Sequence, residues 1–125
     1  MTTLEVGKKL VELCKQNKHM EAIETLYSPN IVSVEAFAPP GKPASMEGID
    51  AVKGKADWWF NNHEIHGGKA EGPWPHGDKF IVRFTYDVTP KNGPMAGKRF
   101  VMEEAGLYAV KEGKIVKEEF FYHMG

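Results

Sequence analysis

Cysteine is almost absent from this chain of 125 residues, in which Cys14 is the only one. One cysteine forms no intrachain disulfide, and it provides neither a C-x-x-C redox motif nor a cysteine zinc site. Cys14 lies in an apolar stretch, which is typical of a small buried side chain rather than of a reactive thiol. Disulfides are rare in reducing compartments, so this composition predicts a cytoplasmic protein.

Long apolar runs and an excess of charge of one sign are also missing. No segment approaches the roughly 18 apolar residues of a membrane span. Near the N-terminus, lysines lie within an apolar repeat of helical spacing instead of before an apolar run, which predicts a helix and not a signal peptide. The 16 Lys and Arg residues nearly balance the 17 Asp and Glu residues, for a formal net charge of -1. Because nucleic acids select basic surfaces, we expect neither a nucleic acid nor a membrane as partner.

Three segments of the first half have the apolar spacing of amphipathic helices. The first covers residues 3–16, with Thr2 or Thr3 as its cap, and the second runs from Met20 to Tyr27, where Pro29 ends it. The third begins at Gly48 and continues to about residue 63. We expect the first two helices to form a bent pair.

Strands are predicted for the rest of the chain. The β-branched segment 31–37 is the first, and a meander follows near residues 65–71, 79–89, 98–110 and 114–122, separated by turns rich in Gly, Pro, Asn and Asp. This order predicts an α+β fold with one domain over residues 1–125, in which three helices pack on the concave face of a strongly curved antiparallel sheet. A cavity between the two layers is the expected place for a small ligand.

The segments LYSPNIVSVEAF, MEGIDAVKGKADWWF and LYAVKEGKIVKEEFFY resemble the NTF2-like superfamily, and within it the SnoaL-like and ketosteroid-isomerase-like small proteins. The resemblance covers nearly the full length and implies an NTF2-like cone. It specifies the fold better than the chemistry, because this superfamily contains isomerases, polyketide cyclases, dehydratases and transport factors.

Comparison with ketosteroid isomerases implies that Glu35 occupies the position of the catalytic base. In that family a tyrosine and a protonated aspartic acid stabilise the oxyanion, and the ungapped comparison places Val11 and Ala105 at these two positions. Losing one such donor typically costs about 3 to 4 kcal/mol of transition-state stabilisation. Steroid isomerisation by the same mechanism is therefore not expected, and a non-catalytic Glu35, facing solvent or paired with a lysine such as Lys42, is the alternative.

Two further acidic pairs provide candidate acids or bases. Resemblance to SnoaL-like cyclases implies a carboxylate on the last strand, and the comparison favours Glu118 over Glu119. Glu103 and Glu104 point to opposite faces of their strand, and we expect Glu103 to face the cavity with Val101, Ala105 and Leu107. The alternative is an ion pair between the inward acid and an arginine, Arg83 or Arg99.

Aromatic side chains are the candidate ligand-binding residues, since stacked rings can hold a flat molecule; the alternative is that they only fill the core. The candidates are Phe37, Trp58, Trp59, Tyr86, Phe120 and Tyr122. His63 and His66 are three residues apart, whereas the zinc-protease motif requires a spacing of four. No phosphate-binding glycine motif is present, so we expect neither a metal nor a cofactor.

The outer face of the sheet predicts self-association. Phe100, Met102 and Tyr108 alternate along one strand, on the side opposite to the expected cavity, and would form a large exposed apolar patch. We therefore expect a homodimer through this face. The leading hypothesis is a protein that binds a small, largely apolar molecule in the cone, with Glu35 as the base of an isomerase, cyclase or dehydratase. The alternative is a noncatalytic ligand sensor or dimerisation module.

Overall fold

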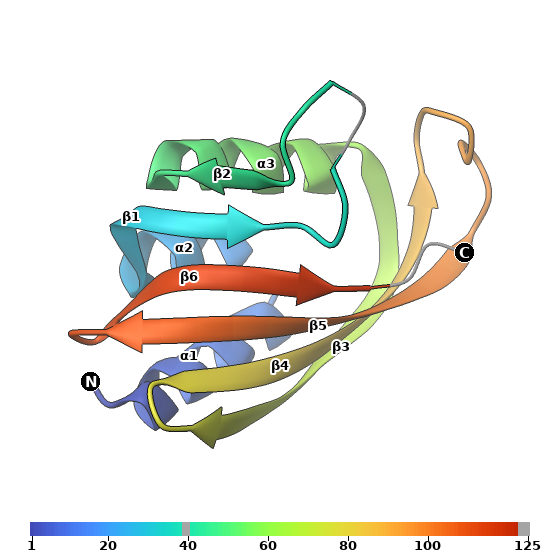
Figure 1. Ribbon diagram of the computed structural model, residues 1–125. Coiled ribbons are helices and arrows are strands. Elements are labelled where there is room, and N and C mark those ends of the chain that lie inside the picture. The colour runs from blue at the N-terminus through green and yellow to red at the C-terminus, as the bar shows by residue number, and fades with distance from the viewer. Residues whose placement is uncertain (39–40, 123–125) are drawn as a thin grey trace.

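The computed structural model describes residues 1–38 and 41–122. Three helices and a six-stranded sheet form the NTF2-like cone that the sequence predicted (Figure 1). In chain order the elements are α1 (Thr3–Lys15), α2 (His19–Leu26), β1 (Tyr27–Val34), β2 (Ser45–Glu47), α3 (Ile49–Asn61), β3 (His63–His76), β4 (Lys79–Pro90), β5 (Phe100–Lys111) and β6 (Lys114–Phe121).

The helices begin where local chemistry allows it. Thr2 caps α1: its hydroxyl accepts a hydrogen bond from the Glu5 backbone, and the Glu5 carboxylate accepts one from the Thr2 backbone. Gly48 precedes α3 with φ at 93°, in the left-handed region that favours glycine. In the described part of the chain, no helix combines the length and apolar character needed to cross a membrane.

The sheet is mixed, which corrects the prediction of an entirely antiparallel one. Its strand order is β2-β1-β6-β5-β4-β3, and β1 pairs in parallel with β6 while all other neighbours are antiparallel. The parallel pair joins the first long strand to the last, and its register places Ser33 beside Glu118. Figure 1 shows the three helices on one side of the curved sheet.

Two boundaries in this region differ from the predictions. Helix α2 ends at Leu26 and strand β1 starts at Tyr27, so Pro29 lies inside the strand instead of between helix and strand. Proline is tolerated there because the pairing of β1 with β6 is irregular between Tyr27 and Val32, where a missing backbone donor costs little. The short strand β2, in the segment predicted as a loop, pairs with the end of β1.

The core lies between the helices and the concave face of the sheet. Phe80 and Val82 of β4 are at most 1% exposed, and the Phe80 ring stacks on Tyr108 of β5 with 5.0 Å between centroids. Tyr108 is therefore an interior residue, and the predicted assignment of the two faces of β5 was inverted. Apolar residues occupy both faces of this strand, since Phe100 and Val101 begin two alternating apolar rows, so alternation alone does not select a face.

Candidate functional site

A buried carboxylate is the inner end of a chain of polar side chains on the concave face. Glu118 of β6 is only 3% exposed. One of its oxygens accepts a short hydrogen bond from the hydroxyl of Tyr27, and the other accepts one of 2.7 Å from Ser33 Oγ. Both donors come from β1, which the parallel pairing places against β6.

Opposing effects act on the pKa of Glu118. The pKa of Glu118 is raised, because burial and the charge of Glu35 outweigh the effects that lower it. These are the positive charge of Lys55, with Nζ 3.9 Å from Glu118 Oε2, and the bonds from Tyr27 and Ser33. Burial and the nearby Glu118 charge raise the pKa of Tyr27 well above its ordinary value, so this hydroxyl keeps its proton. Because Glu118 is only 3% exposed, its carboxylate is inaccessible to a ligand.

Lys55 of α3 connects this buried end to a partly exposed end at Glu35, Phe37 and Tyr122, termed the opening of the cone. Its ammonium donates to Ser33 Oγ at 2.5 Å and to Glu35 Oε1 at 2.7 Å, and lies 5.2 Å from the centre of the Phe120 ring. The hydroxyl of Tyr122 donates to the second Glu35 oxygen at 3.0 Å. The side chains of Lys55 and Glu35 remain 21% and 24% exposed, so the outer end of this polar chain is accessible to solvent.

Glu104 is a third carboxylate on the same face of the sheet. Burial raises its pKa to about 7, the negative charges of Glu35 and Glu118 add to this effect, and Lys55 opposes it. Within the described residues its carboxylate has neither a hydrogen bond nor a salt bridge. Near neutral pH, Glu104 therefore divides between the protonated and the ionised form.

Glu103 lies on the outer face, which corrects the predicted orientation of this pair. Its carboxylate bonds to Arg83 Nη2 at 2.9 Å, and both side chains are more than half exposed. The proposed arginine partner is thus real, but it pairs with the outward acid. The same one-residue shift places Ala105 on the outer face, where it lines a shallow hollow.

The aromatic candidates divide between the interior and the surface. Trp59 lies inside the cone, with its ring 5.2 Å from Tyr86 and 4.4 Å from His63. Trp58 is 59% exposed and does not line the interior. At the opening, Phe37 is 46% exposed and its ring meets the edge of Tyr122 at 5.5 Å, so these two rings border the outer end of the polar chain.

Sequence reasoning missed Lys55, Ser33, Tyr27 and Glu104. Lys55 follows Val52 by three residues and precedes Trp59 by four, so it lies on the core-facing side of α3, and this spacing was available as a signal. Glu104 precedes Tyr108 by four residues on one strand, and a correct inward assignment of the tyrosine would have found it. Ser33 and Tyr27 have no comparable signal, because their role depends on the parallel pairing with β6.

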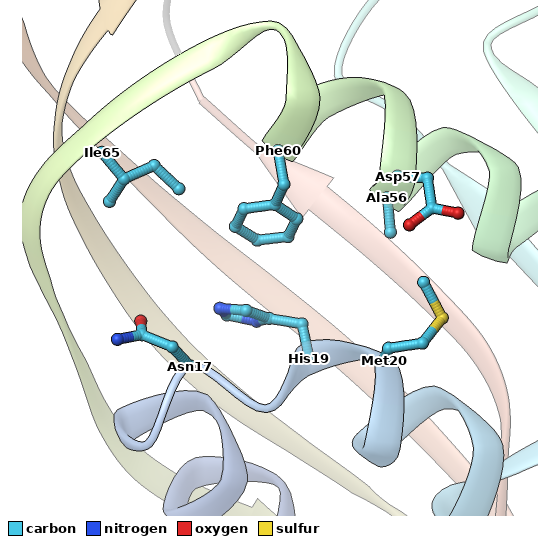
Figure 2. A pocket seen from close by; sticks show the side chains of 7 residues that line it. All are labelled: Asn17, His19, Met20, Ala56, Asp57, Phe60 and Ile65. Atoms are coloured by element: carbon cyan, nitrogen blue, oxygen red, sulfur yellow. The ribbon is translucent and has the colours of Figure 1, made fainter.

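A hollow of about 350 Å³ lies on the helical side of the cone. Its lining comes from the α1–α2 connection, α2, α3 and the start of β3, and consists of Asn17, His19, Met20, Ala56, Asp57, Phe60 and Ile65. Figure 2 shows the rings of His19 and Phe60 facing each other there, with 4.4 Å between centroids. Burial lowers the pKa of His19, so its ring is neutral at pH 7.

Residues 1–38 and 41–122 contain no arrangement of side chains that would support metal or thiol chemistry. No three His, Cys, Asp or Glu side chains of this part converge in a way that could hold a metal ion. Burial, assisted by the charge of Glu118, raises the pKa of Cys14 to about 12, so its thiol stays protonated. The lack of a cofactor remains a prediction.

Several solved structures share this fold. A protein of Mesorhizobium loti, provisionally named a SnoaL-like polyketide cyclase with carbohydrate phosphatase added in brackets, is 45% identical, with a TM-score of 0.89 over 98% of this chain and 100% of that one. An NTF2-like protein of Burkholderia thailandensis is 20% identical, with a TM-score of 0.80 over 98% and 92%.

A third structure, from Catenulispora acidiphila, has a ketosteroid isomerase-like fold and was determined in complex with trimethylamine. It is 19% identical, with a TM-score of 0.72 over 98% of this chain and 88% of that one. No curated protein matches the sequence. The sequence profile of the SnoaL-like domain matches residues 1–122, almost the whole chain. The described fold, the 45% identical structure and this match together identify the chain as a member of the SnoaL-like domain family.

Proposed function

We propose that this protein binds a small, largely apolar molecule at the opening of the cone and moves a proton on it, with Glu35 as the base. The class of reaction is isomerisation, cyclisation or dehydration next to a carbonyl group. In each of these reactions Glu35 first takes a proton from carbon, and the electron pair of that bond passes to the carbonyl oxygen. In isomerisation the proton then returns at another position, in cyclisation the enolate carbon bonds to a second carbonyl carbon, whose oxygen takes the proton, and in dehydration the electron pair expels a hydroxyl group that leaves with the proton as water.

The position of Glu35 supports this role. Among the three inward carboxylates, Glu35 combines solvent access with fixed partners, because Lys55 holds one oxygen and Tyr122 the other. Phe37 and Phe120 provide apolar surface near it. A ligand at this opening would therefore have its reacting carbon against a positioned carboxylate and its apolar part against aromatic rings.

Glu118 and Glu104 receive different roles from their surroundings. Glu118 acts as a positioning residue, because it reaches Lys55 through Ser33 and is itself inaccessible. Glu104 is suited to supply or store a proton, because a pKa of about 7 keeps both of its forms populated at neutral pH. Carboxyl groups whose surroundings push their pKa values apart are the usual basis for separate acid and base roles.

The observation that carries the proposal is the excess of carboxylates over cations. Three glutamates of the concave face, Glu35, Glu104 and Glu118, influence one another electrostatically, and Lys55 is the cation that acts on all three. A structural ion pair needs one acid and one base. The additional carboxylates, whose pKa values are raised, favour acid and base chemistry, as perturbed groups in a cleft generally do.

The direct test measures proton abstraction without knowledge of the natural substrate. Small cyclic ketones of increasing size are incubated with the protein in heavy water, and exchange of the protons next to the carbonyl is followed by NMR. We expect exchange above the buffer rate for at least one ketone, and loss of most of this rate in Glu35→Gln. Glu103→Gln is the matched control, because this outward glutamate lies far from the proposed chemistry on the other face of the sheet.

A noncatalytic module is the second candidate, and one observation favours it. The protein's own rings occupy much of the space between the layers: Tyr86 stacks with Phe84 at 6.0 Å and contacts Trp59 at 5.2 Å. Exchange at the buffer rate with every ketone, together with no thermal stabilisation by any of them, would favour this second candidate over catalysis.

We further propose a cytoplasmic homodimer joined through the outer face of the sheet. The apolar residues of this face are not those that the sequence suggested: Ile81 is 42%, Val101 60% and Phe121 52% exposed. Trp74 of β3 extends the same surface and is 54% exposed. Trp74, Ile81 and Phe121 line one hollow on this face, and Val101 lies further along β5, beyond Glu103. Exposed apolar side chains on four neighbouring strands are typical of an interface.

A further inference from the structure

We infer that the Lys55 ammonium stabilises the negative oxygen of the bound molecule, which restricts the ligands to compounds with an enolisable carbonyl or an acidic hydroxyl, such as ketones and phenols. This inference rests on the proposed function, since it names the partner of the base Glu35. It assigns the stabilisation of this oxygen to a residue outside the two donor positions of the isomerases.

The position of the ammonium makes this contact feasible. Lys55 uses two of its three N–H groups, toward Ser33 Oγ at 2.5 Å and Glu35 Oε1 at 2.7 Å. Within the described residues the remaining N–H has no hydrogen-bond acceptor, because Glu118 Oε2 is 3.9 Å away. With one fifth of the side chain exposed, a ligand oxygen can approach the ammonium beside Glu35.

Charge balance during proton transfer favours this use of Lys55. Before the transfer its positive charge faces the ionised Glu35. When Glu35 accepts the proton it becomes neutral, and the same unit of negative charge appears on the ligand oxygen. Lys55 can then exchange one anionic partner for another while the net charge of the site stays constant, so its interaction with the ligand strengthens as the reaction proceeds.

Other groups are less well placed to donate to this oxygen. Val11 and Ala105, at the positions of the isomerase donors, have no polar side-chain atom, and Ala105 lies on the outer face. Trp58 is directed to solvent. Tyr86 faces the interior and keeps its proton, because burial raises its pKa. It is therefore the competing donor that an experiment has to separate from Lys55.

The experiment uses 4-nitrophenol as an enolate mimic, because its neutral and ionised forms have distinct absorption bands. The probe is titrated with protein at several pH values, and both the affinity and the ionised fraction of the bound probe are measured. In the wild type we expect the bound probe to ionise at lower pH than in solution, because its oxygen faces the positive charge of Lys55. Loss of a hydrogen bond to a charged group predicts that Lys55→Gln binds the phenolate about ten- to hundredfold more weakly.

Three more variants separate the roles. Lys55→Arg keeps the charge and should retain most of the ionised fraction. Glu35→Gln should bind the phenolate more tightly, because no carboxylate then competes for the ammonium. Lys53→Gln is the control, since Lys53 is a surface lysine of α3 that lies 3.8 Å from Glu24. If Lys55→Gln does not fold, Lys55→Gln combined with Glu118→Gln removes the uncompensated buried charge and takes its place.

The outcomes distinguish this inference from the proposed function. No binding of the probe by the wild type, an unchanged ionised fraction in Lys55→Gln, or loss of that fraction in Tyr86→Phe alone would overturn the role of Lys55. If no ketone exchanges protons but the bound nitrophenol still ionises at lower pH than in solution, catalysis would be overturned and Lys55 would remain an anion-binding residue.

Discussion

The two faces of strand β5 show how strongly position determines the chemistry of one residue type. Glu103 and Glu104 are neighbours in the chain, yet the first lies in solvent beside Arg83 and the second lies inside the cone without such a partner. On the inner face, burial raises the pKa of Glu104 to about 7. The comparison shows that burial, and not the position of the residue in the sequence, creates a carboxyl group able to exchange protons at neutral pH.

The lysines of α3 extend this comparison and give the largest expected effect. Lys55→Met removes the cation between Glu35 and Glu118, and breaking such a pair typically destabilises a protein by about 3 to 5 kcal/mol. Lys53→Met removes only an exposed pair with Glu24, for which less than about 1 kcal/mol is expected. Urea unfolding of both variants measures the difference. Equal losses of stability in the two variants would contradict the distinction between the inward Lys55 and the outward Lys53.

The neighbouring glutamates provide the second prediction. Because the pKa of Glu104 is raised from 4.5 to about 7, the folded state keeps a proton that the unfolded state releases in this range. Stability therefore falls as the pH rises from about 4.5 to 7, by about 3 kcal/mol in total. Glu104→Gln should lack this fall and exceed the wild type in stability at about pH 8.

The control for this prediction is Glu103→Gln. Its carboxylate is paired in solvent, so the pH dependence of unfolding should follow that of the wild type. Unfolding curves at about pH 4.5 and pH 8 are sufficient. A Glu104→Gln variant that keeps the wild-type pH dependence would show that Glu104 is ionised in the cone.

The inner end of the polar chain gives the third prediction. Tyr27→Phe leaves one oxygen of the buried Glu118 without its donor, which should reduce the unfolding free energy by about 1.5 to 3 kcal/mol. Tyr122→Phe removes a donor to the partly exposed Glu35 and should cost less, because water can replace it. Thermal melts of both variants compare the loss of stability at the two ends of the polar chain. A larger loss in Tyr122→Phe would contradict the conclusion that water is excluded from Glu118.

The smallest change in protomer stability is expected on the outer face. Val101→Lys alters a side chain that is 60% exposed, so the free energy of unfolding of the protomer should change by less than about 1 kcal/mol. It should nevertheless separate the proposed dimer, because a charge is placed in an apolar contact. Light scattering at micromolar concentration measures the mass, and a wild type that is monomeric there contradicts the proposal.

Much of the fold was predictable because its signals are local. The helical spacing around Val6 and Leu10, the capping threonine and the turn before β6 all depend on residues close in sequence. The turn before β4 was predicted too long, because β3 continues to His76. The parallel pairing of β1 with β6 was not predictable in this way, since it joins strands from opposite ends of the chain. The three-residue strand β2 gives too short a pattern for recognition.

The site was predictable only in part, for the same reason. Glu35 and Glu118 were found through resemblance, and both belong to the polar chain that the structure describes. Lys55 was overlooked because a lysine on an amphipathic helix is usually assigned to solvent. Glu104 was exchanged for Glu103 because a shift of one residue reverses every side chain of a strand.

The parallel pairing also determines when the site can exist. Ser33 and Glu118 are separated by 85 positions in the chain, and Lys55, which lies near both, comes between them in sequence. A fragment that ends before β6 lacks Glu118 and therefore cannot contain the complete polar chain. During synthesis the acidic interior therefore stays unformed until β6 has emerged, and contacts of such long range are among the slowest to form. Acquisition of the proposed activity should coincide with the end of folding, so that a partly folded chain has no complete site.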